Sequence, residues 1–255
     1  MDLHSGLPYW IIRNSLWDYF HPLEKDLSTD VVIVGSGITG ALMAHELCHA
    51  GIKCCIVDKR SIATGSSAAS TALLQYEIDV PLCRMAKIIG EENAATAYHA
   101  CLQSISDIKR VLEETGVNAG FEQLPSLFYA SSAADNKLLE QEHEIRQKHK
   151  LPVNLLEKKK IREEYKVKTP GNALINEASA QMDAYRAATG LLAYHIKESG
   201  LKVFTHTSIK ECIETSDGCI MTTDRGHKIK CGYVIIATGF EAGQFLPQKI
   251  MDLTS

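Results

Sequence analysis

Three glycines and one aspartate have the types and the spacing needed to bind a dinucleotide. Gly35, Gly37 and Gly40 form the pattern G-x-G-x-x-G, and Asp58 follows about twenty residues further on. In such a motif the first glycine permits a tight turn, the second lets the backbone approach a pyrophosphate, and the third lets a helix pack against a strand. A carboxylate at position 58 can accept hydrogen bonds from ribose hydroxyls.

The elements expected around these residues are those that a dinucleotide-binding unit requires. The β-branched run at residues 30–34 has the pattern of a strand buried on both faces. A helix is expected over residues 41–49 and a second strand over 53–57. The pyrophosphate would lie on amides at the helix N-terminus, including those of Ile38 and Thr39, where the helix dipole favours negative charge. Glycines also fill ordinary turns, but here all parts occur in order, so the sequence predicts dinucleotide binding.

The rest of the chain is expected to contain both helices and strands. The patterns predict helices over residues 82–115, 133–150, 157–165 and 182–199, and strands over 121–130, 201–205, 208–214, 218–223 and 228–236. Residues 59–71 form a loop of small and hydroxyl-bearing residues, for which we favour contact with the ligand over a solvated connection. Residues 82–169 lack buried parallel-strand runs, so we expect them largely outside the nucleotide-binding core, with strand 121–130 outside the parallel sheet.

Composition and charge argue against several classes of protein. The chain has 255 residues, 45% hydrophobic and 23% charged, with a formal net charge of −4. Basic and acidic residues are interspersed, so neither a nucleic-acid partner nor a membrane surface is indicated. No apolar run could span a bilayer, and the aromatic N-terminal arm (residues 1–27), expected to pack against the domain, lacks the features of a secretory signal. Eight cysteines without a C-x-x-C pair indicate neither a zinc site nor a disulfide framework, so a cytoplasmic location is expected.

Four stretches, which together span most of the chain, carry a resemblance to a known family. They are the unit at residues 30–58, the small-residue loop at 58–70, the strand at 203–209, and the strand and Ala-Thr-Gly turn at 233–239. The layout resembles the N-terminal part of the flavin-dependent amino-acid and amine oxidoreductases of the D-amino-acid oxidase type, which include glycine oxidase-like enzymes. A glycine fingerprint alone fits FAD or NAD, whereas a late strand that returns to an Ala-Thr-Gly turn is typical of FAD-binding relatives.

The resemblance implies an α/β fold, with a Rossmann-like FAD-binding domain built on a parallel sheet and a partial α+β substrate or cap domain. The expected division is residues 1–81 for the N-terminal arm and the first part of the FAD-binding domain, 82–169 for cap elements, and 170–255 for the return to the FAD-binding domain. In such enzymes the loop lies along the flavin, and the two later strands meet the adenine and the nucleotide. The resemblance therefore adds these expected FAD contacts: Lys59, Thr64, Ser66, Ser67, Ile209, Ala237, Thr238 and Gly239.

Two departures from the family pattern concern the cofactor and the activity. Some amine-dehydrogenase relatives carry a loop histidine that bonds covalently to the flavin. Ala69 stands at the equivalent position, so non-covalent FAD is expected. Relatives also continue well beyond the Ala-Thr-Gly turn, with sequence that contacts the substrate carboxylate and lines the flavin ring. Since this chain ends at Ser255, it is expected to retain FAD weakly and to oxidise no amine.

By resemblance, the protein is expected to oxidise the C–N bond of a small-molecule substrate, an amino acid or a secondary amine, by hydride transfer to flavin. The electron acceptor stays open between oxygen and a respiratory or protein carrier. The sequence shows no recognisable acid–base dyad, nucleophile or metal cluster, so no catalytic residue is named, and the oligomeric state is open. Two alternatives remain. One is a nicotinamide-dependent dehydrogenase, in which residues 59–71 and 237–239 would have no role, and the other is a non-catalytic FAD-binding fragment.

Overall fold

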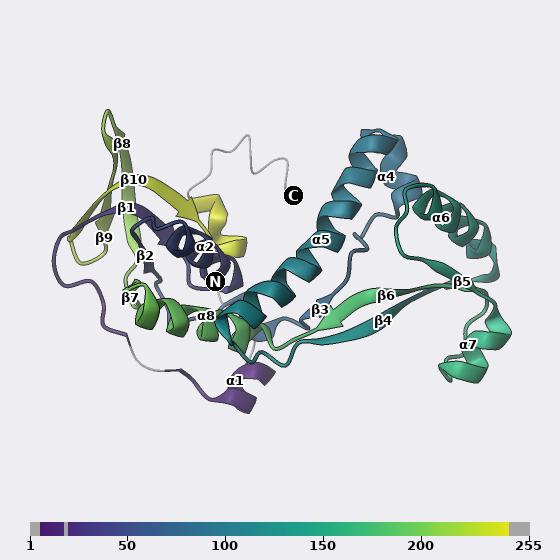
Figure 1. Cartoon of the computed structure of the whole chain (residues 1–255). Coiled ribbons are helices and arrows are strands. Elements are labelled where there is room, and N and C mark those ends of the chain that lie inside the picture. Colours follow the sequence, from purple (N-terminus) through teal and green to yellow (C-terminus); the bar gives the residue numbers. More distant parts are fainter. Residues whose placement is uncertain (1–5, 18–19, 245–255) are drawn as a thin grey trace. The chain divides into compact units, whose positions relative to one another are not determined.

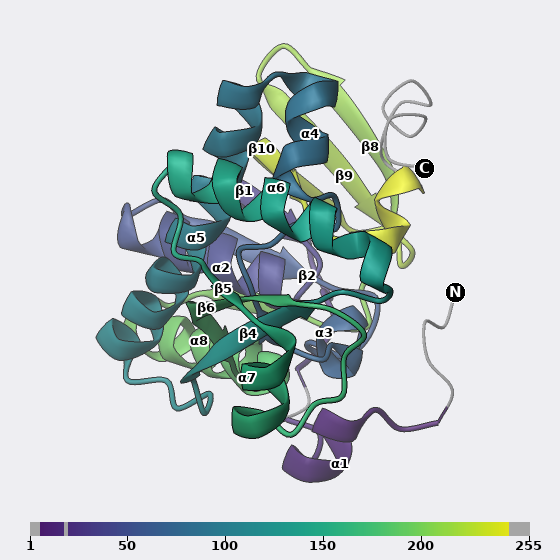
Figure 2. The same cartoon turned by 90° about the vertical axis from the view of Figure 1, so that its right-hand side faces the viewer.

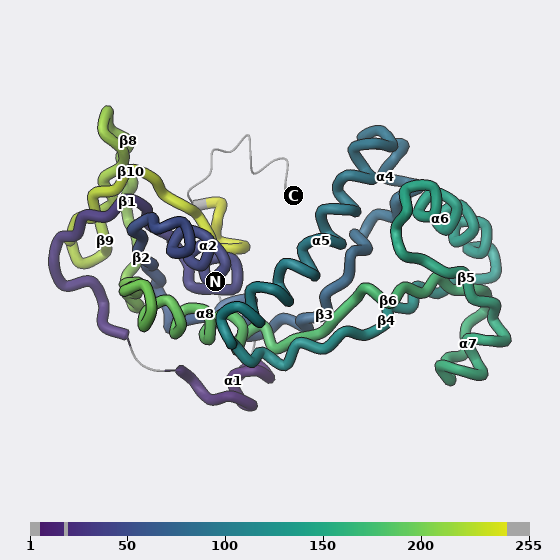
Figure 3. The backbone as a smooth tube through the Cα atoms, viewed as in Figure 1, coloured from purple at the N-terminus to yellow at the C-terminus, as the bar shows by residue number. Residues whose placement is uncertain are grey.

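Two structural units share the chain, and the first is assembled from segments that are far apart in the sequence. The computed structural model describes residues 6–17 and 20–244. Within these, the first unit comprises the residues up to Thr71, residues 114–119 and those from Asp183 onwards, and the second comprises residues 72–113 and 120–182. The backbone trace in Figure 3 shows the chain leaving the first unit and returning to complete it.

A mainly parallel sheet forms the centre of the first unit (Figure 1). Its strands, in spatial order, are β7 (Lys202–Phe204), β2 (Cys54–Val57), β1 (Leu27–Val34), β10 (Lys228–Ile236), β9 (Gly218–Thr223) and β8 (Ile209–Thr215). The first four strands run parallel to one another, and β9 and β8 extend the sheet in antiparallel fashion. Val32, Ile33, Ile56 and Val57 are all 0% exposed, as expected for apolar runs covered on both faces.

Two helices of the first unit pack against each other. α2 (Ile38–His49) follows β1, and α8 (Ala184–Glu198) lies beside it. Both helices bury small residues such as Ala44 and Ala188, which allow close approach of their backbones. Asp183 caps α8, because its side chain accepts a hydrogen bond from the backbone N–H of Arg186 at 2.9 Å.

The described part of the N-terminal arm lies against the first unit. It contains α1 (Tyr9–Asn14), which is held at two points. The indole N–H of Trp10 donates to the carbonyl of Ser70 at 2.8 Å, and the amide of Asn14 donates to the carboxylate of Asp183 at 2.7 Å. Two further short helices, α3 (Ser66–Ala69) and η2 (Gly239–Gln244), complete this unit.

The second unit is an antiparallel sheet with helices on both faces (Figures 1 and 2). β6 (Ala173–Gln181) pairs with β3 (Leu73–Leu74), β4 (Glu122–Tyr129) and β5 (Asn154–Leu156). The helices are α4 (Leu82–Ile89), α5 (Glu91–Thr115), η1 (Ala133–Asp135), α6 (Asn136–Lys148) and α7 (Lys158–Glu164). Successive residues of β6 face opposite sides, since Leu174 packs with Leu139 of α6 and Ile175 with Ile161 of α7.

A buried ionic network lies in the core of the second unit. Arg146, only 1% exposed, donates to Glu142 at 2.7 Å and to Glu77 at 3.1 Å, and its guanidinium lies over the rings of Tyr76 and Tyr98. The carboxylate of Glu142 also accepts the backbone N–H groups at the start of α4, at 2.8 Å each. Arg146 and Glu142 are both buried, so losing either partner would leave an uncompensated buried charge.

The predicted fold class is confirmed, as is the position of strand 121–130 outside the parallel sheet, since β4 pairs antiparallel in the second unit. Several local expectations were wrong. The helix expected over 82–115 is divided into α4 and α5 at Gly90, whose φ of +87° no helix residue adopts. The central strand β6 was missed, because its sequence mixes apolar, small and charged residues without alternation. In the described residues no helix is long and apolar enough to cross a membrane.

Candidate cofactor-binding site

The glycine turn after β1 brings three backbone segments together. Gly35 has a φ of +110°, and a Cβ atom there would lie 2.4 Å from the carbonyl oxygen of Ala237. A Cβ atom on Gly40 would lie 2.0 Å from the carbonyl oxygen of Gly35. Both positions therefore require glycine, the first for the turn and its contact with the end of β10, the second for the approach of α2 to the turn.

The N-terminus of α2 points its first amides at this turn. Gly37 is the residue before the helix, and the N–H of Ile38 donates to the hydroxyl of Ser67 at 2.9 Å. The amides of Thr39 and Gly40 belong to the same turn, where an α-helix offers no partner of its own. A helix end of this kind carries a partial positive charge, which suits an anionic group such as a pyrophosphate.

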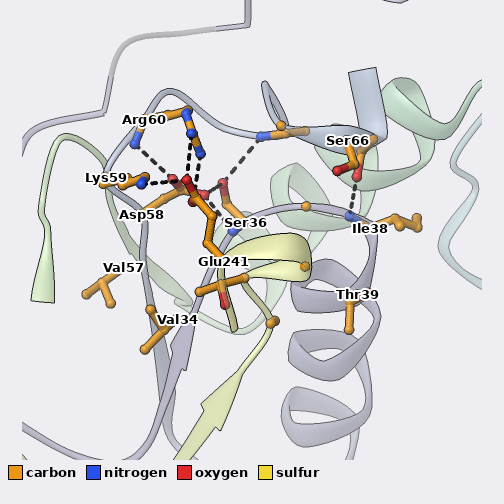
Figure 4. A pocket seen from close by; sticks show the side chains of 18 of the residues that line it. Val34, Ser36, Ile38, Thr39, Val57, Asp58, Lys59, Arg60, Ser66 and Glu241 are labelled. Carbon is orange, nitrogen blue, oxygen red and sulfur yellow. Dashed lines mark hydrogen bonds and ion pairs between the residues drawn. The ribbon is translucent and has the colours of Figure 1, made fainter. Parts of the chain in front are cut away.

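Asp58 is fixed at the end of β2 by hydrogen bonds to its carboxylate (Figure 4). Its Oδ2 atom accepts from the backbone N–H of Ser36 at 2.8 Å and from the Ser36 hydroxyl at 2.6 Å. Its Oδ1 atom accepts from the backbone N–H of Arg60 at 2.8 Å. A carboxylate has about four acceptor positions, so Oδ1 keeps capacity for a ligand hydroxyl while the side chain is held in one orientation.

Glu241 joins the segment after β2 to the segment after β10. Its carboxylate accepts from the ammonium of Lys59 at 2.7 Å and from the guanidinium of Arg60 at 3.0 and 3.1 Å (Figure 4). The hydrogen bonds from Arg60 and Lys59 lower the pKa of Glu241 to about 2, although burial acts in the opposite direction. The Glu241 side chain is 11% exposed, but those of Lys59 and Arg60 are 36% and 29% exposed, so the ion pairs are only partly shielded from solvent.

These segments enclose a pocket of about 250 Å³ within the first unit. Most of the residues predicted from sequence line it: Gly35, Gly37, Ile38, Thr39, Asp58, Lys59, Ser66, Ser67, Ile209, Ala237, Thr238 and Gly239. Gly40 and Thr64 do not. Gly40 lies behind the turn, where it allows helix packing, and the hydroxyl of Thr64 donates to the carbonyl of Ser61 in its own loop at 2.7 Å.

Further residues that line the pocket were not named individually from the sequence. Ser36, Arg60, Thr207 and Ser208 lie in segments that were expected to contact the ligand, at residues 35–40, 59–71 and 203–209, whereas Glu241 lies outside them. The signal for Ser36 was its place between two glycines of the motif, next to the end of β1. Glu241 gave no local signal, because its partners are about 180 residues earlier in the chain.

Thr238 provides a test of whether the pocket fits a polar ligand. Its hydroxyl oxygen is buried and has no hydrogen-bond partner among the described residues. It lines the pocket next to the glycine turn. A buried hydroxyl without a partner costs about 1–3 kcal/mol, and a bound nucleotide group would remove that cost. The donor amides of α2, the carboxylate of Asp58 and this hydroxyl therefore match the chemistry of a dinucleotide.

A family model described as FAD dependent oxidoreductase (DAO) matches residues 30–254. The chain belongs to this family. The match begins at β1 and includes every predicted site residue, so the family assignment and the pocket concern the same part of the chain.

Known proteins of similar sequence or fold cover most of this chain. The putative Rieske 2Fe-2S iron-sulfur protein YhfW of Bacillus subtilis is 23% identical over 232 residues, which are 91% of this chain and 44% of that protein. The glycine oxidase of Geobacillus kaustophilus superposes with a TM-score of 0.70 at 22% identity, over 84% of this chain and 56% of that one. The L-proline dehydrogenase of P. horikoshii gives a TM-score of 0.68 at 22% identity, over 86% and 55%. The chain thus spans about half the length of these relatives, and the structural likeness establishes the fold.

Replacing Glu241 by glutamine should destabilise the first unit of this DAO-family chain. We expect Glu241→Gln to lower the free energy of unfolding by about 1 kcal/mol at pH 7, because a neutral amide cannot balance both cations. The pKa of Glu241 is depressed from 4.5 to about 2, so the wild-type advantage should be complete above pH 4.5 and shrink as the pH falls towards 2.

Urea unfolding of both proteins at pH 7 and pH 3 measures this difference. Glu198→Gln is the matched control, since Glu198 pairs with Lys197 in an exposed position and should contribute nothing measurable. Equal stability of Glu241→Gln and wild type at pH 7 would contradict a stabilising ion pair.

Proposed function

We propose that the first unit binds FAD non-covalently, with the ADP half of the cofactor in the pocket. The amides at the start of α2 would bind the pyrophosphate, and Asp58 would bind the ribose. Ile209 and the turn at residues 237–239 would complete the nucleotide contacts. The observation that carries this proposal is the contact of Gly35 with Ala237, which joins the two nucleotide-binding motifs at one pocket. A covalent link through the 59–71 loop is not expected, because the loop contains no histidine.

We propose that the whole protein oxidises the C–N bond of an amino acid or secondary amine. Bound FAD would supply the acceptor for the hydride from the carbon that bears the amine. The residues of this chain would hold the cofactor through the glycine turn and Asp58, and the second unit, with the expected cap segment 82–169, would contribute to the substrate domain. Support comes from relatives of similar fold whose names state an amino-acid substrate, glycine oxidase and L-proline dehydrogenase.

A nicotinamide-dependent dehydrogenase is less well supported. Residues of the 59–71 loop and the turn at 237–239 both line the pocket, and a nicotinamide cofactor would give them no role. Calorimetric titration of the purified chain with FAD, ADP and NADH separates the two possibilities. We expect FAD and ADP to bind and NADH to bind more weakly than FAD. Preferential retention of NADH in a colourless protein would reject the flavin proposal.

A specific observation supports a protein electron acceptor rather than oxygen. The matched part of YhfW, a relative named as a putative Rieske iron–sulfur protein, corresponds to 91% of this chain. We propose that the electron acceptor of the whole protein would be an iron–sulfur centre of this kind. Assays of the complete reading frame with a panel of amino acids and amines should show dye reduction with little hydrogen peroxide. Rapid stoichiometric peroxide formation would favour oxygen, and no turnover with any substrate would favour a non-catalytic FAD-binding fragment.

A reducing compartment such as the cytoplasm is the location we propose. All eight cysteines are present as free thiols, which is typical of proteins that are kept reduced. Fractionation of the source cells tests this location directly.

Removing the carboxylate of Asp58 should weaken FAD binding. We expect Asp58→Ala to cost roughly 1–3 kcal/mol of binding free energy, because the ribose hydroxyls would lose a charged acceptor. The orientation of Ser36 would be lost as well, since its N–H and hydroxyl both donate to this side chain. Quenching of flavin fluorescence measures the affinity, and Asp58→Asn, which keeps one acceptor oxygen, should lie between the two. Unchanged affinity in Asp58→Ala would remove Asp58 from the site.

A further inference from the structure

Two cysteine thiols lie next to each other at the far end of the nucleotide-binding unit. Cys48 is in the last turn of α2 and Cys54 is the first residue of β2. Their Sγ atoms are 3.9 Å apart, and both residues are partly exposed. The other ends of the same helix and strand reach the pocket, at Ile38 and Val57. Along the helix, Cys48 is about 15 Å from Ile38, so the thiols form a site separate from the proposed cofactor site.

The surroundings of the pair make the two sulfur atoms unequal. A hydrogen bond from the thiol of Cys54 lowers the pKa of Cys48 to about 7, with a further contribution from Ser199, although burial opposes the shift. The same hydrogen bond and burial raise the pKa of Cys54. Of the two hydrogen-bonded thiols, Cys48 is therefore the more acidic and the better placed to supply a thiolate. A thiolate is the reactive form of cysteine, and a neighbouring thiol is what resolves its oxidised product.

Imidazole groups beside the pair do not turn it into a metal site. One ring nitrogen of His195 forms a hydrogen bond with the hydroxyl of Ser199, and the other forms one with a ring nitrogen of His45, each at 3.0 Å. Burial lowers the pKa of His195, and the neighbouring His45 and His49 lower it further. The histidines are thus held by one another and by Ser199. Among the residues that the structure describes, no group of three His, Cys, Asp or Glu side chains could hold a metal ion. The reactive groups at this end of α2 and β2 are therefore the two thiols of Cys48 and Cys54.

We propose that Cys48 and Cys54 form a reversible disulfide when the protein meets hydrogen peroxide or a related hydroperoxide. The Cys48 thiolate attacks one peroxide oxygen, the O–O bond breaks, and hydroxide leaves to give a sulfenic acid. The sulfur of Cys54 then attacks the sulfenic sulfur, and the S–OH oxygen leaves as water after taking up a proton. In sum, two thiols and one peroxide give one disulfide and two waters, and a dithiol reductant reverses the reaction.

The remaining cysteines provide an internal comparison. Cys212 is the exposed one, and burial together with neighbouring Cys219 raises its pKa, so its reactive thiolate is scarce at neutral pH. Cys55 follows Cys54 directly but is only 1% exposed, and burial raises its pKa to about 12. If exposure alone decided the order of oxidation, Cys212 would be oxidised first. Our proposal predicts instead that Cys48 is oxidised first.

Differential alkylation followed by peptide mapping tests the proposal on the full chain. The reduced protein is treated with hydrogen peroxide, the remaining thiols are alkylated, and the digest is examined by mass spectrometry. Trypsin cleaves after Lys25, Lys53 and Lys59, so the disulfide would join peptide 26–53 to peptide 54–59. We expect this linked species, with the mass of two hydrogen atoms lost, before any oxidation of Cys212. Dithiothreitol should abolish it.

Single substitutions assign the partners and keep the proposal falsifiable. Cys54→Ser should prevent the cross-link and send Cys48 on to sulfinic acid, and Cys48→Ser should leave Cys54 as a free thiol. Cys212→Ser is the matched control and should cross-link like wild type, with thermal melts confirming that each variant is folded. The proposal is overturned if Cys54→Ser still yields the linked peptides through Cys55. It is equally overturned if Cys48 and Cys54 stay alkylatable at peroxide concentrations that oxidise Cys212.

Discussion

Gly40→Ala is expected to unfold the first unit or prevent it from forming. Alanine would normally favour a helix over glycine by about 1 kcal/mol, so helix propensity alone predicts a gain. The added Cβ atom, however, would lie 2.0 Å from the carbonyl oxygen of Gly35. Backbone atoms cannot yield as a flexible side chain does, and α2 would have to move away from the turn. We expect a net loss of about 3 kcal/mol or more in the free energy of unfolding.

Chemical denaturation monitored by circular dichroism measures the effect of Gly40→Ala. Glu46→Ala is the control, because it also introduces an alanine into α2, at a position that is exposed. The control should change the unfolding free energy by less than about 0.5 kcal/mol. A Gly40→Ala protein as stable as wild type would mean that α2 can shift without cost, and the close packing of helix and turn would not be required.

Gly37→Val is expected to abolish FAD binding while leaving the fold intact. A Cβ atom at this position meets only the hydroxyl of Ser67, at 3.0 Å, and the φ of −71° is open to any residue. The branched side chain would instead occupy the space that a pyrophosphate needs at the helix N-terminus. We expect affinity for FAD to fall by about 100-fold or more, which corresponds to roughly 2.7 kcal/mol.

The test of Gly37→Val combines flavin absorbance after purification with titration by FAD. Gly37→Ala should show a smaller loss, since its single methyl group fills less of the site. Thermal melts without cofactor should agree for all three proteins, which separates loss of binding from loss of folding. Full flavin content in Gly37→Val would reduce the glycine motif to a structural turn and would remove the basis of the proposed cofactor site.

The site residues that could be predicted from sequence are those that lie close together in the chain. Gly35, Gly37 and Asp58 belong to one strand–helix–strand unit with fixed offsets, and the resulting contacts are determined by backbone geometry. Ser36 lies inside that unit, and its bonds to Asp58 could have been anticipated from the same geometry. Glu241 could not, because any of 31 acidic residues could in principle have met Lys59 and Arg60.

The second unit was harder to predict for a related reason. Helix α6 has a polar sequence, yet it buries Glu142 and Arg146, which pair with each other, while Arg146 also donates to Tyr76 and Glu77 from a distant segment. A buried ion pair has the same sequence pattern as a solvated one, so only the tertiary partners distinguish them. Strand β6 was missed because its residues face two different helices and show neither alternation nor a continuous apolar run.

The position of β10 has a consequence for how the protein is made. β1 pairs on one side with β2, which follows it closely in the chain, and on the other side with β10. The residues of β10 are synthesised some 200 positions after those of β1. Until then, the apolar strand β1 presents a row of unsatisfied N–H and C=O groups on its open side, and such an edge can pair with another chain. Closing so long a loop is slow, because its entropy is lost before the new contacts form. Nascent chains that have not reached residue 236 should therefore depend on chaperones and aggregate more readily than the finished unit.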